Sequence, residues 1–123
     1  MEQSMVRALR GATTLHADTP EQVAERTQEL LQQMMDQNSL SVDDVISILF
    51  TATHDIVSAF PATPARLNGF GEVPLMCAQE IPVVGATERC IRVMMHISTS
   101  LPRGELHHVY LHDAKGLRDD LPQ

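Results

Sequence analysis

No stretch of this sequence approaches the ~20 consecutive apolar residues that a membrane-spanning helix needs, so we expect no such segment. The first four residues also lack the positive charge and apolar run of a secretory signal peptide. Cysteine is scarce, since only Cys77 and Cys90 are present, and their spacing matches no metal site. A single disulfide is an alternative, but free thiols in a cytoplasmic protein are the better interpretation.

Lysine is scarcer still, because Lys115 is the only lysine among nine basic residues. The formal net charge is −7, and an acidic chain argues against nucleic acid as the main partner, since phosphate binding needs a basic face. Residues 1–62 carry three basic and nine acidic groups, whereas residues 63–123 carry six and seven. Arginine binds carboxylates through two parallel hydrogen bonds. The sequence therefore predicts that a site for a small anion would draw mainly on the second half.

Several motifs that carry chemistry in other proteins are absent. The chain has no glycine-rich phosphate loop, no Gly-x-Ser-x-Gly nucleophile motif and no internal repeat. His108 and His112 have a spacing that binds zinc when it falls on a helix. Their segment alternates like a strand, however, and no third ligand lies close in the sequence. We therefore expect no metal site.

The 123 residues fit one domain, and we expect its ends, residues 1–4 and about 119–123, to be flexible tails. A helix start at Thr19, followed by apolar residues at helical spacing, predicts one amphipathic helix of about 18 residues. One long helix cannot cover both faces of a sheet, so we expect the second face to pack against another subunit. The predicted fold class is α+β, with short helical turns and a mixed five-stranded sheet formed by 5–14, 45–53, 73–79, 90–99 and 107–112, although 45–53 could also form a helix.

Two arginines stand on otherwise apolar strands. Arg10 lies among small apolar residues, and the alternative to a functional role is an arginine on an edge strand that extends to reach water. Arg92 lies in the middle of the clearest strand, 90–99. Its alternative is a structural ion pair with Glu88 or another acid.

Three further side chains are candidates for a site. Glu80 stands at the end of a predicted strand, where a carboxylate is commonly just solvated. Tyr110 is the only tyrosine, and its hydroxyl either serves a ligand or completes the edge of the core. Cys77 has no histidine at a spacing that would indicate a nucleophile, so a buried cysteine is the simpler interpretation.

Five segments form an ordered set along the chain: 6–14 (VRALRGATT), 59–62 (AFPA), 73–80 (VPLMCAQE), 90–95 (CIRVMM) and 107–111 (HHVYL). Together they resemble the trimeric α/β class of monofunctional chorismate mutases, and the match covers nearly the whole chain. The resemblance implies a single domain over residues 1–123 with the family's pseudo α/β barrel. It also implies a homotrimer whose active sites lie between neighbouring subunits.

The resemblance implies an isomerase that rearranges chorismate to prephenate in phenylalanine and tyrosine biosynthesis. This pericyclic reaction needs no cofactor, metal or covalent intermediate. Catalysis then depends on holding a compact conformer of the dianionic substrate and on fixed charges near the ether oxygen, where negative charge grows. A non-catalytic trimeric module that binds small carboxylates is the alternative, motivated by departures from the family pattern at Thr63 and Met76. A purely structural trimer is a third possibility.

By the same resemblance, Arg92, Glu80 and Arg10 are the catalytic residues. Arg92 would donate to the ether oxygen, Arg10 would hold the side-chain carboxylate, and Glu80 would accept a hydrogen bond from the ring hydroxyl. Tyr110 would bind a substrate carboxylate, and Cys77 would contact the same hydroxyl as Glu80. The residues expected to line or close the pocket are Phe60, Ala62, Thr63, Arg66, Leu75, Met76, Leu117 and Arg118.

Overall fold

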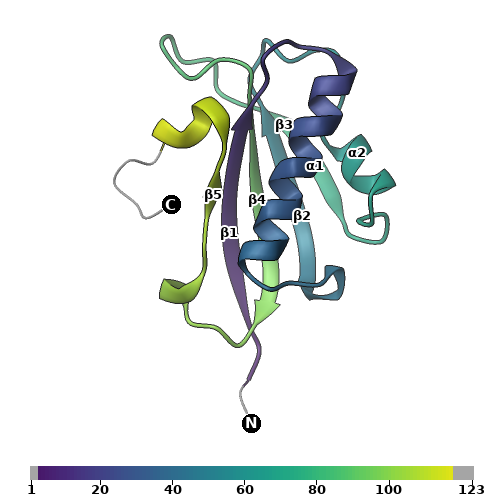
Figure 1. Ribbon diagram of the computed structural model, residues 1–123, viewed down its shortest axis with the longest axis vertical. Helices are drawn as coiled ribbons and strands as arrows, with labels where there is room; N and C mark the ends of the chain where they lie inside the picture. Colours follow the sequence, from purple (N-terminus) through teal and green to yellow (C-terminus); the bar gives the residue numbers. More distant parts are fainter. Residues whose placement is uncertain (1–2, 118–123) are drawn as a thin grey trace.

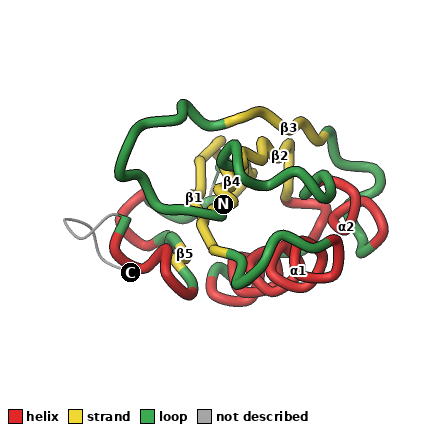
Figure 2. The backbone as a smooth tube through the Cα atoms, turned by 90° about the horizontal axis from the view of Figure 1, so that it is seen from above, coloured by secondary structure: helices red, strands yellow, loops and turns green. Residues whose placement is uncertain are grey.

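The computed structural model describes residues 3–117 as one five-stranded sheet with two α-helices on the same side (Figures 1 and 2). The order of strands across the sheet is β3-β2-β4-β1-β5. This confirms the α+β class and the mixed five-stranded sheet. The elements are β1 (Met5–Thr14), α1 (Pro20–Gln37), η1 (Val42–Asp44), β2 (Val45–Ala52), α2 (Ala62–Leu67), β3 (Leu75–Gln79), β4 (Cys90–Thr99), η2 (Arg103–Glu105), β5 (Val109–Tyr110) and η3 (His112–Gly116), where η marks a 3-10 helix.

Strand β4 is the centre of the sheet. It pairs antiparallel with β1 on one side and with β2 on the other. Strand β3 pairs parallel with β2, and strand β5 pairs parallel with β1. The β1–β4 ladder runs without interruption from Met5 opposite Thr99 to Thr14 opposite Cys90. Because side chains alternate between faces along each strand, this register decides which residues meet on each side of the sheet.

Helix α1 begins and ends as its sequence predicts. The Thr19 hydroxyl accepts from the backbone N–H of Gln22 at 3.1 Å, and Pro20 takes the first helical position. The Gln22 side chain accepts from the His16 backbone N–H at 2.9 Å, which links the helix start to the preceding loop. The face of α1 that packs on the sheet consists of Val23, Thr27, Leu30, Leu31, Met34 and Met35.

Gly11 allows α1 to lie close against β1. A Cβ at this position would lie 2.5 Å from Met34 Sδ and 3.1 Å from Leu30 Cδ1, so any other residue would push the helix side chains away. Arg10 and Ala12, on either side of Gly11, point to the opposite face because strand side chains alternate.

The opposite face of the sheet, here called the open face, carries no α-helix within residues 3–117 (Figure 2). It presents β1 from Val6 to Ala12 and β4 from Arg92 to Ser98, at every second residue. Val6 is 63% exposed. Only its β5 end is covered, where η3 packs Ala114 against Ala12 and Tyr110.

The C-terminal part of the fold differs from the sequence prediction. The strand expected over 107–112 is reduced to Val109–Tyr110. On its C-terminal side, the chain leaves the extended conformation at His112, which has a positive φ of 54°. Lys115 and Gly116 form the end of η3. The His112 ring lies 2.7 Å from Glu29 of α1, which links this segment to the long helix. Of the tails expected at 1–4 and 119–123, residues 1–2 and 119–123 lie outside the described residues.

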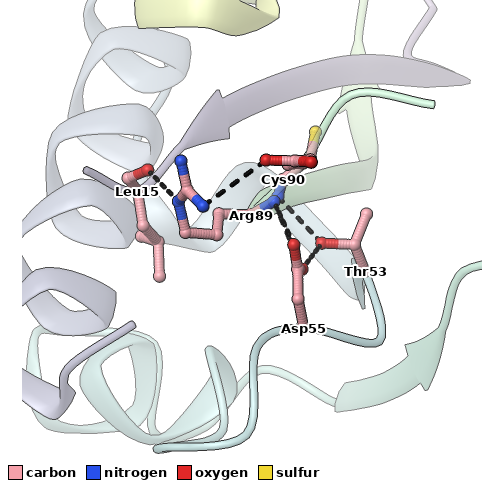
Figure 3. Close-up of polar contacts among 6 residues, drawn as sticks. Leu15, Thr53, Asp55, Arg89 and Cys90 are labelled. Atoms are coloured by element: carbon pink, nitrogen blue, oxygen red, sulfur yellow. Dashed lines mark hydrogen bonds and ion pairs between the residues drawn. The ribbon is translucent and has the colours of Figure 1, made fainter. Parts of the chain in front are cut away.

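A polar network sets the point at which β4 begins (Figure 3). The Asp55 carboxylate accepts from the backbone N–H of Arg89 at 3.0 and 3.2 Å and from the Thr53 hydroxyl. Thr53 Oγ1 accepts in turn from the backbone N–H of Cys90 at 3.0 Å. Arg89, held at a φ of 45°, donates from Nε to the Leu15 carbonyl at 3.2 Å. These contacts tie the ends of β1 and β2 to the start of β4 and so fix its register.

Replacing Thr13 by valine should raise the free energy of unfolding by about 1 kcal/mol, because a fully buried hydroxyl without a partner is replaced by a methyl group. Thr13 is 0% exposed, and its Oγ1 has no hydrogen-bond partner in the described part of the chain. The matched control is Thr14→Val, since Thr14 Oγ1 accepts from the Asp113 backbone N–H at 3.1 Å. That change should cost about 1 kcal/mol. Urea unfolding at equal protein concentration measures both, and two changes of the same sign would contradict the assignment.

Replacing Asp55 by asparagine should cost about 2 kcal/mol of stability at neutral pH, because a charged acceptor of several hydrogen bonds is lost. Partial burial acts to raise the pKa of Asp55, but the hydrogen bonds from Thr53 and the Arg89 N–H outweigh it and hold this pKa below 3.8. A lowered pKa stabilises the fold above the ordinary value, and this stabilisation is lost as the pH falls through the lowered pKa.

Urea unfolding at neutral pH and at about pH 3 should therefore show the difference between wild type and Asp55→Asn becoming smaller in acid. The control is Asp43→Asn, because Asp43 is exposed on η1. A difference that stays constant over this range would show that the Asp55 charge does not stabilise the fold.

Candidate active site

A pocket of about 220 Å³ lies on the open face and is lined by Arg10, Thr51, Glu80, Arg92 and Tyr110 together with apolar neighbours. We call it the open-face pocket. The structure thus brings together the three residues expected to be catalytic and the tyrosine expected to bind a carboxylate.

The register of the sheet explains why these side chains meet. Arg92 on β4 lies opposite Ala12 on β1 and opposite Thr51 on β2. Tyr110 on β5 lies opposite Ala12 from the other side. The small Ala12 side chain therefore lies between Arg92 and Tyr110. It forms the floor of the pocket, and the two larger side chains stand on either side of it. Arg10 stands two residues away on the same face.

Arg92 is paired with an acid, but not with Glu88. Its Nε lies 3.7 Å from Glu80 Oε2, and the Arg92 side chain is still 48% exposed. Glu88 is instead 3.5 Å from Arg89. The alternative interpretation of Arg92 was a structural ion pair with an acid, and Glu80 provides such a pair. An ion pair at this distance and exposure contributes little stability, so it does not by itself account for an arginine here.

The Glu80 carboxylate is held by β2. Its Oε2 accepts a hydrogen bond from the Thr51 hydroxyl, and its backbone N–H donates to the Ala52 carbonyl at 2.9 Å. Thr51 was not a candidate from the sequence. A threonine in an apolar strand looks like a β-forming residue, and only the pairing of β2 with β4 places it beside Arg92.

Arg10 does not lie on an edge strand, because β1 is between β4 and β5. Strand β5 pairs only with Gly11 and Ala12, and the backbone N–H of Arg10 donates instead to His108 Nδ1 at 3.0 Å. The interpretation of Arg10 as an edge-strand residue is therefore wrong. Its side chain is half-buried at the wall of the open-face pocket.

Tyr110 lines this pocket, and the buried Cys90 packs in one cluster with Tyr110 and Ala12. The Tyr110 hydroxyl has no hydrogen-bond partner among residues 3–117, although the oxygen is buried. A buried unpaired hydroxyl is costly, and one beside a pocket indicates a partner from outside the chain. Burial raises the pKa of the Cys90 thiol despite the nearby Arg92 guanidinium, so Cys90 is an unreactive core residue.

The remaining candidates do not line the open-face pocket. Phe60 and Cys77 line a second hollow of about 480 Å³ formed by residues 52–54, 56–61 and 77–79, here called the β3-edge pocket. Cys77 lies opposite Phe50 on the helix-covered side, so within one chain it is on the other face of the sheet from the Glu80 carboxylate.

The other residues expected to line the site are distributed around these pockets. Ala62 is buried in the core, Leu75 packs partly against it, and Met76 is 67% exposed on the open face of β3. Thr63 and Arg66 are exposed on α2. Leu117 packs beside Tyr110 and Ala12, and Arg118 lies outside the described residues.

The described residues give no indication of a metal centre. Within residues 3–117 there is no group of three or more His, Cys, Asp or Glu side chains that could hold a metal ion. In the same range, no helix is both long and apolar enough to cross a membrane.

Comparisons with known proteins identify the family. A family model described as chorismate mutase type I matches residues 6–121. The chain is similar to chorismate mutase AroH of Bacillus subtilis, with 42% identity over 95% of this chain and 93% of the relative. It is also similar to chorismate mutase AroH of Thermus thermophilus, with 45% identity over 95% of this chain and 97% of the relative.

A solved structure extends the similarity to the fold. The chorismate mutase from Clostridium thermocellum matches this chain with a TM-score of 0.87 and 48% identity. The match covers 89% of this chain and 97% of the solved chain. The fold, the match over nearly all of the sequence and the curated relatives lead to one conclusion. The chain belongs to the type I chorismate mutase family and is an isomerase.

Proposed function

We propose that the chain forms a homotrimer and rearranges chorismate to prephenate in clefts that neighbouring subunits build together. The observation that carries this proposal is the separation of the candidate residues into two groups. Arg10, Glu80, Arg92 and Tyr110 meet in the open-face pocket, whereas Phe60 and Cys77 lie in the β3-edge pocket. A cleft that contains both groups needs two chains.

The surface supports an assembly of this kind. Apolar side chains around the β3-edge pocket are exposed, with Val57 at 82% and Phe60 at 71%. On the open face, Val6 and Met76 are also exposed. Exposed apolar side chains gathered around a pocket indicate an interaction surface. In the proposed trimer the β3 edge of one subunit covers the open-face pocket of the next.

The reaction explains why charge, rather than a nucleophile, is needed. One C–O bond of the enol-pyruvyl ether breaks while one C–C bond forms within the same molecule, and no proton is transferred. Negative charge grows on the ether oxygen and positive charge on the ring. Fixed charges placed beside these two regions stabilise the transition state more than the substrate.

Each side chain of the open-face pocket takes a role in that scheme. Arg92 donates to the ether oxygen, and Arg10 holds the side-chain carboxylate near it. The Tyr110 hydroxyl, which lacks a partner within residues 3–117, donates to a substrate carboxylate. Glu80 accepts from the ring hydroxyl and lies beside the ring where positive charge accumulates.

The neighbouring subunit supplies the opposite wall of the cleft. Its Cys77 contacts the ring hydroxyl from the other side, which removes the difficulty that Cys77 and the Glu80 carboxylate lie on opposite faces of one sheet. The proposal includes a cytoplasmic location, since both cysteines are free thiols. The remaining lining and closing residues are Phe60, Ala62, Thr63, Arg66, Leu75, Met76, Leu117 and Arg118.

Replacing Arg92 by lysine should lower kcat by at least about 100-fold while changing KM much less. Lysine keeps the charge but loses the planar donor group that is fixed toward the ether oxygen. Loss of chorismate absorbance with purified protein measures both constants. Arg103→Lys is the control, because Arg103 is exposed on η2 outside the open-face pocket. Unchanged turnover in Arg92→Lys would show that Arg92 is structural.

Mixing two inactive variants should restore activity if the cleft is shared. In mixed trimers of Arg92→Ala and Phe60→Asp, where the new carboxylate in the β3-edge half repels the dianionic substrate, roughly a quarter of the clefts combine two intact halves. Each cleft takes one half from each of two neighbours in a cyclic trimer. The variants are unfolded and refolded together, and the chorismate assay is repeated.

The matched control is a mixture of Arg92→Ala with Glu80→Ala. Both changes affect the same half of the cleft, so no mixed trimer restores it. Light scattering should give the mass of three chains for every sample. Activity no higher than the mean of the separate variants in the first mixture would contradict sharing, and a monomer that turns over chorismate would contradict the trimer.

A further inference from the structure

Glu80 is held more firmly than its ion pair with Arg92 explains. The 3.7 Å separation between Arg92 Nε and Glu80 Oε2 is long for a charge-assisted hydrogen bond, and the arginine is half exposed. Pairs of this kind leave both side chains free to sample other rotamers. A second contact is therefore needed to keep the carboxylate in one orientation.

Thr51 supplies that contact. Its hydroxyl donates to Oε2 of Glu80, the same oxygen that faces Arg92 Nε. The Glu80 carboxylate is thus fixed through one oxygen, and Oε1 takes part in neither contact. An ionised carboxylate accepts at both oxygens, so Oε1 can receive a hydrogen bond from a ligand.

The position of Thr51 in the sheet makes this contact rigid. Thr51 lies directly opposite Arg92 in the β2–β4 ladder, and the next residue, Ala52, accepts from the Glu80 backbone N–H at 2.9 Å. Threonine is restricted at χ1 by its branched Cβ. Strand β2 therefore holds both the backbone and the carboxylate of Glu80.

The fixed carboxylate in turn orients Arg92. A guanidinium is planar, so engaging its Nε limits the plane in which both Nη groups lie. Arg92 approaches Glu80 through Nε, and its two Nη groups lie beyond Nε on the guanidinium. Those groups can donate into the open-face pocket, toward the position where the ether oxygen is proposed to lie.

We propose that Thr51 is a positioning residue for the rearrangement, and that it acts on the reaction through Glu80 and Arg92. This inference rests on the proposed function, because it needs Glu80 and Arg92 to act on chorismate. It adds a side chain from β2 to Arg10, Glu80 and Arg92, the catalytic residues that the sequence resemblance implies.

The test begins with Thr51→Val and Thr51→Ser. Valine keeps the branched shape and removes the hydroxyl, so kcat should fall roughly tenfold or more while KM stays within about threefold. Serine keeps the hydroxyl, so kcat should stay within about threefold of wild type. The control is Ser47→Ala, on the same strand and face but opposite His96, with kcat expected to be unchanged.

A double-mutant cycle with Glu80→Ala separates positioning from a structural role. If Thr51 acts through the carboxylate, adding Thr51→Val to Glu80→Ala should change kcat by less than about twofold. A structural role would instead lower kcat by the same factor in both backgrounds. The assays use enough enzyme to measure turnover in the Glu80→Ala background.

Four results would overturn the inference. Thr51→Val with wild-type kcat, or an equal loss in both backgrounds, would show that Thr51 does not position Glu80, while the proposed roles of Glu80 and Arg92 would stand. A Thr51→Ser variant with kcat as low as that of Thr51→Val would exclude the hydroxyl as the active group. A Glu80→Ala variant with wild-type turnover would remove the proposed role of Glu80 and the inference with it.

Discussion

The register of the β1–β4 pair is the constraint on which the rest of the structure depends. The ladder between these strands runs over their full length. A slip of one residue would turn every side chain of one strand to the other face. Arg92 would then point toward α1, where a charge has no partner, and Val93 would leave the core for the open face. The contacts around Asp55 and Arg89 fix the start of β4, and so they also determine where Arg92 lies on the open face.

The two faces of the sheet differ in composition, since one packs the apolar core and the other carries the charged pocket. The helix-covered face has an ordinary apolar core, and Gly11 brings α1 against it. The open face carries charged groups whose positions are set by strand pairing rather than by loops. Catalysis by fixed charges needs this rigidity, since a donor that must reorganise during the reaction contributes less. The proposed reaction needs no moving proton, and it is therefore suited to a site on the middle of a sheet.

Sequence patterns predicted most of the fold, because alternation and helical spacing are local properties. The bounds of β1 and β4 agree with the structure, and so does α1 with its Thr19 cap. Alternation on β4 also placed Arg92 on the face away from the core. The shortened β5 and η3 could not be predicted, because they depend on the positive φ of His112 and its contact with Glu29.

The polar contacts of the site were harder to predict than its arginines. An arginine on an apolar strand is visible in one segment. The pairing of Glu80 with Arg92, and the part played by Thr51, require the order of strands across the sheet. The same holds for the separation of Cys77 from Glu80, which stand three residues apart in the sequence and point to opposite faces.

The close approach of α1 to β1 also determines how oxidation of Met34 would affect the fold. Met34 is 0% exposed, and its sulfur occupies the space that a side chain at position 11 would need. Oxidation of methionine adds a polar oxygen to the sulfur, for which this contact leaves no room. An oxidant reaches Met34 only when the helix separates from the sheet, and an oxidised helix cannot repack against Gly11. A transient separation of α1 from the sheet is thereby made permanent by the sulfoxide. The fraction of Met34 sulfoxide in a stored preparation therefore rises with the frequency of such openings.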